Sequence, residues 1–480
     1  MNMKKPGFKF PHVFVLLTGV IFLCSLATYV IPSGVYDRET RLVEGHERIL
    51  LKPGTFRRVE KHFSLQGVLL GKKIEGKASP VGLHGFLTAI PRGMEKAADI
   101  IFFIFIIGGV FGILQRTGVI AAVIQRLLDT LGKSGALLTV VLMAVLAAGG
   151  STLGMGEEFI PLVPVFLLVS QRLGYDRIYG MAIVLLGADV GFAASTTNPF
   201  TVGVAQGIAE VKLMSGIPFR MIFLVAALTL AVVHVLRYGA RIRRDPSTSL
   251  LAREADGPEE PVDEAVYRPR HTAILLGSLA IFAFILFATQ QYGWWMADMA
   301  GGFLLMGIAA AAMARLSVAD TARSFVKGME EMLVAALVVG FARGIAVVLS
   351  DGQIIDTLVH GVAGVLQNLP RVIAVLGMLG YESFLNLFIP SGSGQAAVSI
   401  PLMAPLSDVL GINRQVAVFA FTCGDGFSNM VIPTSGILMA MLSLARVPYG
   451  TWLRFMLPLF IQLMVLSGVF LIIAVLINYR

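Results

Sequence analysis

The chain of 480 residues is poor in charge and in cysteine. Only 14% of its residues are charged, against about 25% in an average soluble protein, while 56% are hydrophobic and the mean hydropathy is +0.80. Its two cysteines, Cys24 and Cys423, each lie inside an apolar run and outside any metal-ligand spacing. A disulfide framework, a zinc site and a thioredoxin-like motif are therefore not indicated, and the composition excludes an ordinary soluble domain.

Motifs of catalysis are also lacking. The glycine-rich run 150–156 is superficially like a phosphate loop, but no Gly-Lys-Ser/Thr follows it. The sequence has no HExxH, and no Ser/Lys or Ser/His dyad can be placed. The net charge of +8 lies in loops between apolar runs and is not gathered on one face. We therefore expect no enzyme activity, no metal, no cofactor and no nucleic-acid partner.

Long apolar runs are what the sequence has in abundance. A membrane-spanning helix needs about 20 predominantly apolar residues. Nine segments qualify, namely 12–32, 98–116, 178–208, 217–237, 272–290, 294–314, 331–350, 414–445 and 451–477. The first run is longer than the ~7–15 residue core of a signal peptide, so we interpret it as a retained helix. The sequence predicts an all-α polytopic membrane protein with about nine transmembrane helices.

Four of the apolar stretches contain breaks. The runs 178–208 and 414–445 are interrupted by Ser195-Thr-Thr-Asn-Pro199 and by Gly424-Asp-Gly-Phe-Ser-Asn429, which cannot continue a helix cheaply. The stretches 135–173 and 371–410 are pairs of short arms, of about 14–18 residues, around Gly/Ser-rich turns. The paired arms predict two re-entrant helical hairpins. Because irregular backbone is tolerated at bilayer depth only inside protein or along a watery cavity, the four breaks should gather together.

The two halves of the chain resemble each other. Leu173-Gly-Tyr-Asp-Arg177 returns as Leu410-Gly-Ile-Asn-Arg414, and other matched residues have offsets of about 234 to 240 positions. The matched elements are separated by an odd number of crossings, which predicts two inverted repeats, as in many secondary transporters. The predicted organisation is a first transmembrane helix (1–32), a periplasmic segment (33–96), a first inverted repeat (97–237), a cytoplasmic linker (238–271), scaffold helices (272–330) and a second inverted repeat (331–480).

Charge placement orients this topology. Lys4, Lys5 and Lys9 precede the first span, and the linker from Arg237 to His271 holds seven arginines, so the positive-inside rule places both in the cytoplasm. The basic segment 33–96 then lies outside, where we expect a small periplasmic domain or an ordered loop.

The breaks and hairpin turns supply the candidate substrate contacts, because they combine hydroxyls, amides and helix termini. The contacts are Ser151, Thr152, Ser195, Thr196, Thr197, Asn198, Ser391, Ser393, Ser428, Asn429, Thr434 and Ser435. The alternative is that these small residues only allow close helix packing.

Charged residues inside the spans extend the candidate site. Glu157, Glu158, Asp189 and Asp425 are candidates for a coupling Na⁺ or H⁺, or for a cationic substrate group. The alternative is that one or two of them cap an adjoining helix. Arg343 lies near the middle of a span and faces either a substrate carboxylate or one of these acids in a structural ion pair.

Several motifs together carry a family resemblance. They are Gly150-Ser-Thr-Leu-Gly-Met-Gly-Glu-Glu158, Gly187-Ala-Asp189 with Ser195-Thr-Thr-Asn-Pro-Phe200, Pro390-Ser-Gly-Ser-Gly-Gln-Ala396 and Gly424-Asp-Gly-Phe-Ser-Asn429. The chain resembles the YfcC branch of the DcuC-type carriers, inner-membrane proteins of the ion transporter superfamily. The resemblance runs from the Phe10-Pro-His12 start to the last span.

This resemblance implies a dimerising scaffold domain and a transport domain that moves as an elevator. Related superfamily members carry a Ser-Asn-Thr signature at the hairpin tips, where the tips here read Ser-Thr and Ser-Gly-Ser. Family names divide between four-carbon dicarboxylates and basic amino acids as substrates. Four acids inside the spans against one arginine favour an amino acid, since a dianion would need positive charge.

The sequence therefore predicts a secondary active transporter of a small carboxylate-bearing metabolite. An amino acid, in particular a basic one, is the first hypothesis, by exchange or by ion-coupled transport, and a C4-dicarboxylate is the alternative. A channel should show a continuous polar lining, and a membrane receptor should carry a sizeable signalling domain; these are the rivals from other classes. The expected partners are the small-molecule substrate, the lipid bilayer and a second copy in a homodimer, in a bacterial inner membrane with the N-terminus in the cytoplasm.

Overall fold

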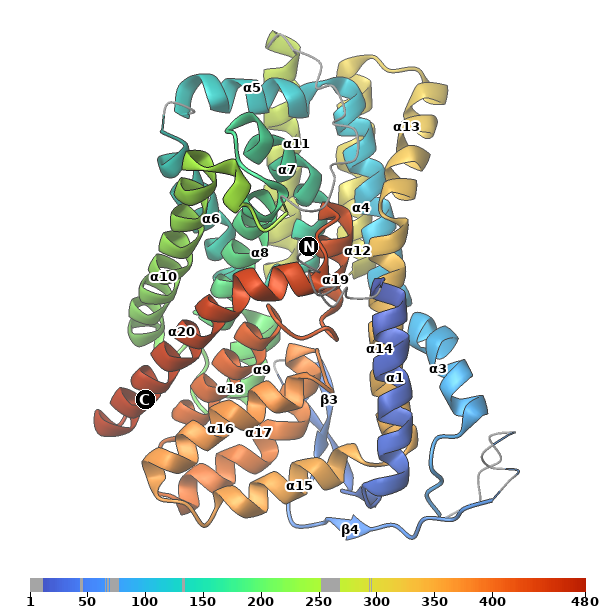
Figure 1. Cartoon of the computed structure of the whole chain (residues 1–480), viewed down its shortest axis with the longest axis vertical. Coiled ribbons are helices and arrows are strands. Elements are labelled where there is room, and N and C mark those ends of the chain that lie inside the picture. The colour runs from blue at the N-terminus through green and yellow to red at the C-terminus, as the bar shows by residue number, and fades with distance from the viewer. Residues whose placement is uncertain are drawn as a thin grey trace, which may run out of the picture.

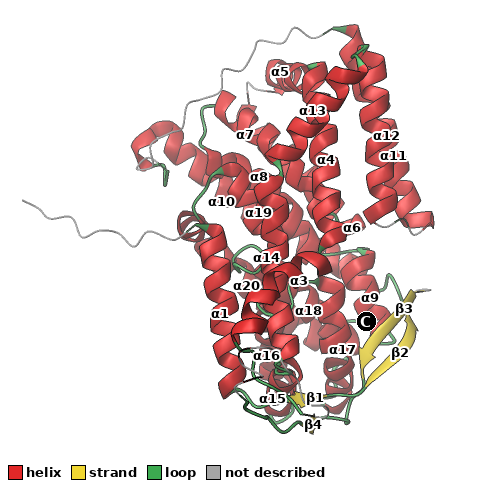
Figure 2. Cartoon of the chain, turned by 90° about the vertical axis from the view of Figure 1, so that its right-hand side faces the viewer, coloured by secondary structure: helices red, strands yellow, loops and turns green. Residues whose placement is uncertain are grey.

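The computed structural model is built almost wholly of helices (Figures 1 and 2). It describes residues 12–43, 46–64, 77–131, 134–251, 268–292 and 296–480, with isolated positions 66, 69 and 294. Part of the predicted cytoplasmic linker, 252–267, and the three N-terminal lysines lie outside the described residues.

The helices of the first half are α1 (Val13–Val30), α3 (Leu83–Lys96), α4 (Ala98–Thr117), α5 (Val119–Leu131), α6 (Gly135–Leu153), η2 (Glu157–Leu162), α7 (Val163–Arg172), α8 (Arg177–Ala193), η3 (Pro199–Gly203), α9 (Val204–Ile208), α10 (Ile217–Arg244) and η4 (Pro246–Thr248). Those of the second half are α11 (Pro269–Tyr292), α12 (Met296–Ala314), α13 (Val318–Glu331), α14 (Leu333–Asp351), α15 (Ile355–Leu366), α16 (Arg371–Asn386), α17 (Gly392–Val409), α18 (Arg414–Ser428), α19 (Gly436–Ala445) and α20 (Tyr449–Leu476).

Eight of the described helices are long and apolar enough to cross a membrane. They are α1, α4, α6, α10, α11, α12, α14 and α20. Seven match predicted spans, and the eighth, α6, is an arm of the first predicted hairpin with 19 residues, one more than expected. The two spans predicted to be interrupted are broken, into α8 and α9 and into α18 and α19. The prediction of an all-α polytopic membrane protein is confirmed.

The order of elements recurs in the two halves. The series α4 to α10 and the series α14 to α20 each contain a long helix, a shorter helix, a pair of helical arms, a broken helix and a long final helix. In Figure 1 the shorter helix of the first series, α5, lies at the top and that of the second, α15, lies at the bottom. The inverted orientation of the repeats and the re-entrant course of the hairpins stay predictions.

Two long lines of helix form one side of the molecule (Figure 1). One line is α3 followed by α4, the other is α13 followed by α14, and α3 packs on α14 while α4 packs on α13. Glycines allow this closeness. A Cβ atom on Gly328 would lie 2.2 Å from the carbonyl oxygen of Gly108, and one on Gly93 would lie 2.5 Å from that of Gly340. Helix α1 packs on α14, α12 packs on α4, and α11 packs on α12. We call this group the scaffold unit.

The arms and the broken helices form a second tightly packed group, the transport unit (α6 to α9 and α16 to α19). A Cβ atom on Gly191 would lie 2.1 Å from the carbonyl oxygen of Ala147, so α6 and α8 are in backbone contact. A Cβ atom on Gly426 would lie 2.4 Å from the Cα atom of Ala193, so the two broken helices cross there. Nearly every residue of α8 and α18 is buried, which fits helices that are apolar on all sides.

The segment between α1 and α3, expected outside the membrane, has a part made of residues 33–43 and 46–58 that forms short strands. We call this part the strand segment. It forms two antiparallel pairs, β1 (Gly34–Val35) with β4 (Arg57–Arg58) and β2 (Arg38–Val43) with β3 (His46–Leu51). Beyond it, the Lys61 ammonium group donates to the carbonyls of Thr28 and Ile31 at the C-terminal end of α1, where a positive charge is favoured.

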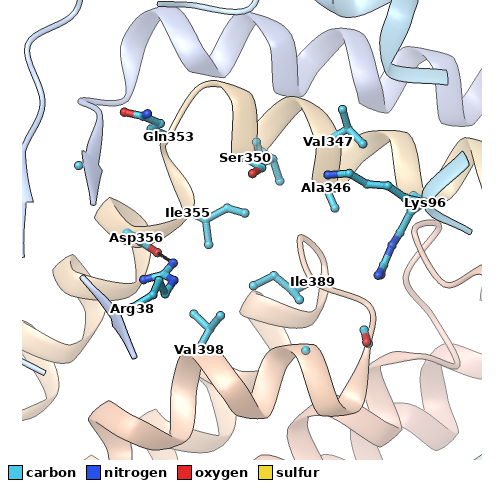
Figure 3. A pocket seen from close by; sticks show the side chains of 15 residues that line it. Arg38, Lys96, Ala346, Val347, Ser350, Gln353, Ile355, Asp356, Ile389 and Val398 are labelled. Atoms are coloured by element: carbon cyan, nitrogen blue, oxygen red, sulfur yellow. Dashed lines mark hydrogen bonds and ion pairs between the residues drawn. The ribbon is translucent and has the colours of Figure 1, made fainter. Parts of the chain in front are cut away.

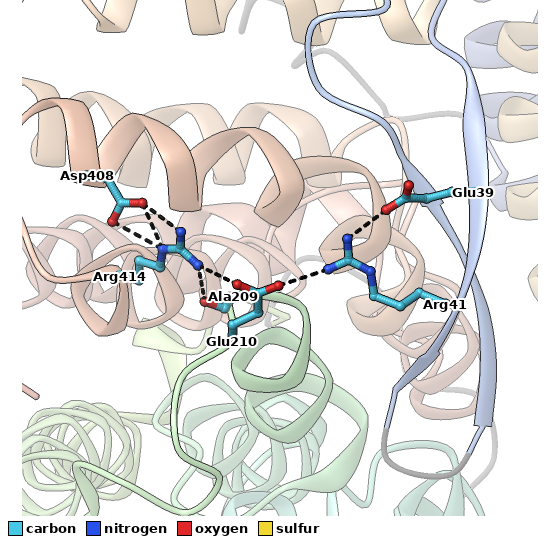
Figure 4. A network of polar contacts seen from close by, with 6 residues as sticks. All are labelled: Glu39, Arg41, Ala209, Glu210, Asp408 and Arg414. Carbon is cyan, nitrogen blue, oxygen red and sulfur yellow. Dashed lines mark hydrogen bonds and ion pairs between the residues drawn. The ribbon is translucent and has the colours of Figure 1, made fainter.

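The strand segment docks on the transport unit through one apolar and one charged contact. Leu50 is 2% exposed and packs among apolar residues of α9, α17 and α18. Arg41 pairs with Glu210 just beyond α9 at 3.2 Å, and Arg414 pairs with the same carboxylate at 3.2 Å (Figure 4). The ion pairs thus join β2 to the ends of α9 and α18.

The glycine contact between α6 and α8 gives a stability prediction. Gly191→Ala should lower the free energy of unfolding by at least about 1–3 kcal/mol, because the new methyl group overlaps the backbone of α6. Gly301→Ala is the matched control, since a Cβ atom there meets nothing within 4 Å in helix α12, and it should stabilise by up to about 1 kcal/mol. Thermal unfolding of both variants in one detergent checks this, and equal melting temperatures would contradict it.

Candidate functional site

The tip of the first predicted hairpin closes the break in the first broken helix. Ser151 is fully buried in the last turn of α6, and its carbonyl oxygen accepts hydrogen bonds from the three successive backbone N–H groups of residues 196–198 at 3.0–3.2 Å. Its hydroxyl also lies 3.0 Å from Oγ1 of Thr196. Because an unpaired backbone group in hydrocarbon costs several kcal/mol, this carbonyl, together with the side-chain contacts around it, makes the break tolerable inside a membrane.

The remaining candidates at this break bond mostly to one another. Oγ1 of Thr197 donates to the exposed Thr152 at its carbonyl, at 3.2 Å. The Ser195 hydroxyl lies 3.1 Å from Oγ1 of Thr201, and Oδ1 of Asn198 accepts from the next free backbone N–H at 2.8 Å. The structure therefore brings together the predicted residues of 151–152 and 195–198, and uses most of their polar atoms to hold the break.

The break in the second broken helix begins later than predicted. The run 424–429 was expected to interrupt the helix, but α18 stays helical through Ser428 and the irregular backbone covers residues 429–435. A glycine inside a helix costs only about 1 kcal/mol, and here Gly424 and Gly426 permit the close contacts of α18 with α16 and α8. Pro433, which removes a donor, lies in the observed break.

Asn386, a residue absent from the predicted site, closes this second break. At the end of α16 it is fully buried, and its Nδ2 donates to the Asp425 carbonyl at 2.7 Å, to Ser428 Oγ at 2.8 Å and to Asn429 Oδ1 at 2.9 Å. It thus donates to the end of α18 beside the second break, whereas Ser151 accepts from the backbone of the first. Its place just before the Gly/Ser turn of the second hairpin was the signal that could have identified it.

Asp425 lies where the two breaks and the second hairpin tip meet. Its side chain is fully buried, and neither carboxylate oxygen has a hydrogen-bond partner in the described part of the chain. A Cβ atom on Gly392, the first residue of α17, would lie 3.4 Å from its Oδ2 and 2.6 Å from Thr201 of the first break. Asp189, 6% exposed on α8, is near enough to Asp425 for their charges to interact.

A cavity of about 310 Å³ separates α14 of the scaffold unit from the tip of the second hairpin (Figure 3). Arg343, which is half-buried, lines it, together with Ser391 and Gly394 of the tip. Lys96 lies at one end of the cavity, and the ion pair between Arg38 and Asp356, of 2.8 Å, lies at the other (Figure 3). Three cationic groups against one carboxylate make the described lining positive, which suits an anion.

The strand segment supplies one wall of this cavity and is held there by Asp356. The carboxylate is 6% exposed and accepts hydrogen bonds from the Tyr36 backbone N–H and from Arg38, each at 2.8 Å. Burial and this neighbouring carboxylate raise the pKa of Tyr36 to about 12, so its hydroxyl stays protonated and bonds Nδ1 of His360 at 2.9 Å.

The remaining predicted residues lie at the second hairpin tip, in the second break and just after the first hairpin tip. Ser393 is half-buried at the second hairpin tip, and the Thr434 hydroxyl is buried in the second break without a described partner. Ser435 caps α19 by accepting from a backbone N–H at 3.4 Å. Oε2 of Glu158 accepts from the Gly156 N–H at 2.9 Å, the geometry of a capping carboxylate.

Glu157 is the last of the predicted acids. It begins the short helix η2, and its charge interacts with those of Glu158 and Asp99.

The count of four acids against one arginine inside the spans was wrong. Arg220, near the start of the span predicted at 217–237, is fully buried and donates to the Ser195 carbonyl at 3.3 Å and to Thr422 Oγ1 at 3.1 Å. It thus joins the first break to α18. Glu382, an acid within an apolar hairpin arm, is 1% exposed. An acid in an apolar arm is a sequence signal that could have identified Glu382 as a buried charge.

A multi-pass helical protein with two broken helices at its centre and a charged cavity beside them belongs to the class of membrane transport proteins. The chain belongs to the DcuC family. The profile of that family, described as C4-dicarboxylate anaerobic carrier, matches residues 10–476.

Two curated relatives extend over almost the whole chain. A protein of Escherichia coli (strain K12) named "Putative basic amino acid antiporter YfcC" is 32% identical over 495 aligned residues, which cover 98% of this chain and 97% of the relative. A Haemophilus influenzae protein, named "Uncharacterized protein", is 28% identical over 519 residues, covering 99% and 98%.

Two solved transporter structures resemble the fold at low identity. The Alcanivorax borkumensis YdaH transporter has a TM-score of 0.45 and 17% identity over 98% of this chain and 99% of its own. Neisseria gonorrhoeae MtrF, described with a class of antimetabolite efflux pumps, has a TM-score of 0.43 and 17% identity over 97% and 96%.

The closing role of Asn386 gives a second stability prediction. Asn386→Ala should lower the free energy of unfolding by about 1–3 kcal/mol, because it leaves buried oxygens without their donor. Asn368→Ala is the control, since the Asn368 amide is exposed and donates to one carbonyl at 3.0 Å, and it should change stability by less than about 0.5 kcal/mol. Thermal unfolding in detergent compares the two, and a difference near zero would refute the role.

Proposed function

We propose that the protein is a secondary active transporter that binds a carboxylate group of a small metabolite in the cavity between α14 and the second hairpin tip. The observation that carries this proposal is the positive lining of the cavity. Arg343 and Lys96 have neither an ion pair nor a hydrogen bond among the described residues, so both are free for an anion. The N-terminus of α17 at the tip has no side-chain cap, and its free N–H groups suit a carboxylate.

A four-carbon dicarboxylate fits this cavity best. Its two carboxylates would pair with Lys96 and Arg343, and the only described acid in the lining, Asp356, is already paired with Arg38. The family description names such a substrate. The conformation in hand thus supports the alternative from the sequence over the first hypothesis.

An amino acid is the second candidate, and a different observation favours it. Asp425 and Asp189 are buried beside the hairpin tip without a cationic partner among the described residues, so either could face the ammonium group of an amino acid. The relative of 32% identity carries the name of a basic amino acid antiporter.

The mechanism that we propose is an elevator. The scaffold unit and the transport unit each pack with close backbone contacts inside themselves, whereas a cavity separates α14 from the second hairpin tip. Although α14 also packs on α19, two units that are each rigid inside favour sliding of one against the other. A homodimer through the scaffold unit, a bacterial inner membrane, a cytoplasmic N-terminus and the absence of enzyme activity belong to the same proposal, as do exchange or ion coupling.

Thermal stabilisation of the purified protein distinguishes the substrates, because a ligand that binds the folded state raises its unfolding temperature. The panel is succinate, fumarate, malate, arginine, ornithine and lysine, each with and without sodium. We expect a saturable shift with the dicarboxylates. A shift with the basic amino acids alone would replace the first candidate by the second, and no shift with any carboxylate would refute the proposal.

The free cations predict how variants bind. Arg343→Gln and Lys96→Gln should each weaken dicarboxylate binding about 10- to 100-fold, since each removes a charged hydrogen bond of about 1.5–3 kcal/mol. Lys327→Gln, on the exposed surface of α13, is the matched control and should bind as the parent does. Uptake into proteoliposomes as a function of substrate concentration checks this. Equal KM values for all variants would remove the cavity from the binding site.

Asp425 is the acid that we propose for coupling, with Asp189, Glu157 and Glu158 as further candidates for Na⁺ or H⁺. Asp425→Asn should abolish uptake driven by an ion gradient while leaving the folded protein intact, because it keeps the shape and removes the charge. Uptake in proteoliposomes and size-exclusion chromatography are the two readouts. Unchanged uptake would remove Asp425 from the coupling site.

A further inference from the structure

The first turns of the two long final helices, α10 and α20, each send one large side chain to a broken helix. Arg220, the fourth residue of α10, donates from Nη1 to the carbonyl of Ser195, the second residue after α8, at 3.3 Å. Trp452, the fourth residue of α20, donates from Nε1 to the carbonyl of Met430, the second residue after α18, at 2.9 Å. Both side chains are fully buried. The two halves of the chain thus use matching positions for the same hydrogen bond.

This match separates the hydrogen bond of Arg220 from its charge. The neutral indole N–H of Trp452 binds the carbonyl of the second break, so a carbonyl at this position does not require a cation. A guanidinium, in contrast, carries a permanent charge and five N–H donors. Because a buried charge is costly unless a partner compensates it, the charge of Arg220 needs a reason other than the closing of the first break.

One edge of the guanidinium is unoccupied. Nη1 makes the two described hydrogen bonds of the side chain, to the Ser195 carbonyl and to Thr422 Oγ1 at 3.1 Å. Nε and Nη2 of Arg220 are buried, and neither has a hydrogen-bond partner among the described residues. The N–H groups of these two nitrogens lie parallel, and arginine uses such a pair of donors to bind a carboxylate at two points. The free edge therefore has the geometry of an anion site.

No acidic side chain pairs with Arg220 within the described ranges. Asp425 lies one helical turn beyond Thr422 on α18, but both of its carboxylate oxygens are without a described partner, so the two charges do not meet. The Phe419 ring, whose centroid lies 5.5 Å from Cζ of Arg220, attracts the cation weakly and offers no acceptor oxygen.

The helix that carries Arg220 adds to the positive charge. A long side chain in the first turn leans toward the N-terminus of its own helix, and that end is partially positive. The first turn of α10 has no acidic residue, and its N-cap, Gly216, provides no side-chain cap. A buried guanidinium and a helix N-terminus thus lie together without a described counter-charge, which favours a bound anion.

We propose that the edge of Arg220 formed by Nε and Nη2 binds a small monovalent anion between α10 and the transport unit, beside the first break. A carboxylate group of the transported metabolite and a chloride ion from solution share this chemistry, since each can accept both N–H groups. The site shares no lining residue with the cavity at Arg343. Its chloride form is independent of the proposed function, and its carboxylate form rests on that function.

Anion binding to the purified full-length protein tests the proposal. Sodium chloride or sodium formate replaces sodium methanesulfonate, a bulkier anion, at constant ionic strength and pH. The thermal unfolding temperature is measured at each concentration. We expect a saturable rise with chloride, with formate or with both, because a ligand of the folded state stabilises it. The anion that produces the rise identifies the source. The same unfolding temperature in all three salts would overturn the proposal.

Variants at the two matching positions locate the anion. Arg220→Gln removes the charge and should abolish the saturable rise. Arg220→Lys keeps the charge without the parallel donors, and should need about 10- to 100-fold more anion for the half-maximal rise. It tests the site even where Arg220→Gln does not fold. An unchanged half-maximal concentration in the Arg220 variants would refute the site.

Trp452→Phe is the matched control from the other half of the chain. It loses the hydrogen bond to the Met430 carbonyl, so it should unfold at a lower temperature than the parent. Its half-maximal anion concentration should nevertheless equal that of the parent. A purely structural role of Arg220 predicts that the variants at both positions lower the unfolding temperature and that neither changes the anion response, and this result would overturn the proposal.

Succinate separates this proposal from the proposed function. It is titrated in methanesulfonate against the parent, Arg343→Gln and Arg220→Gln. A succinate shift that only Arg343→Gln weakens, with no effect of chloride or formate, overturns the anion site and leaves the transporter proposal standing. A succinate shift that both variants weaken supports the site and assigns a carboxylate to it. A chloride shift that Arg220→Gln abolishes, with no response to succinate or arginine, supports the site and refutes the proposed substrate class.

Discussion

The carbonyl oxygen of Ser151 accepts from three backbone N–H groups of the first broken helix, and the side-chain amide of Asn386 donates to one carbonyl and two side-chain oxygens beside the second break. Inside a membrane no water is present to hydrogen-bond the polar groups of a break, so each break depends on the arm of a neighbouring hairpin. The close glycine contacts between α6 and α8 and between α16 and α18 follow from this requirement, since a carbonyl or an amide reaches a broken backbone only when the two helices nearly touch.

The same closeness concentrates charge. Once the broken helices are buried on all sides, an ionisable side chain on them, such as Asp425 of α18, is removed from solvent, and so is Arg220, which contacts them from α10. Charges of this kind stabilise nothing by themselves and are costly unless a partner compensates them. In a protein that transports ions or anions, the transported ligand can itself supply the compensating charge when it binds.

Most of the architecture could be predicted because it follows from hydropathy and from helix-breaking residues. The spans, both broken helices and the break at 195–199 came from these signals. The later start of the second break could not, because Gly424 and Gly426 serve helix contact there, and a sequence does not distinguish a glycine that permits packing from one that ends a helix. Asn386, Lys96 and Arg38 escaped prediction for a related reason: their roles depend on elements that meet only in the folded chain, and the strand segment is the clearest case.

The strand segment is held to the transport unit by exposed ion pairs and by one buried apolar contact. Arg41, Glu210 and Arg414 are between 31% and 64% exposed, and ions screen such pairs over a distance of about 8 Å at physiological salt. Leu50 is buried in an apolar cluster, which salt does not weaken and which excluded solutes strengthen. The strength of this attachment therefore depends on the ionic strength and on the solutes of the surrounding solution. As ionic strength rises, the exposed ion pairs weaken, while the apolar contact of Leu50 and the buried hydrogen bond from Tyr36 to Asp356 persist.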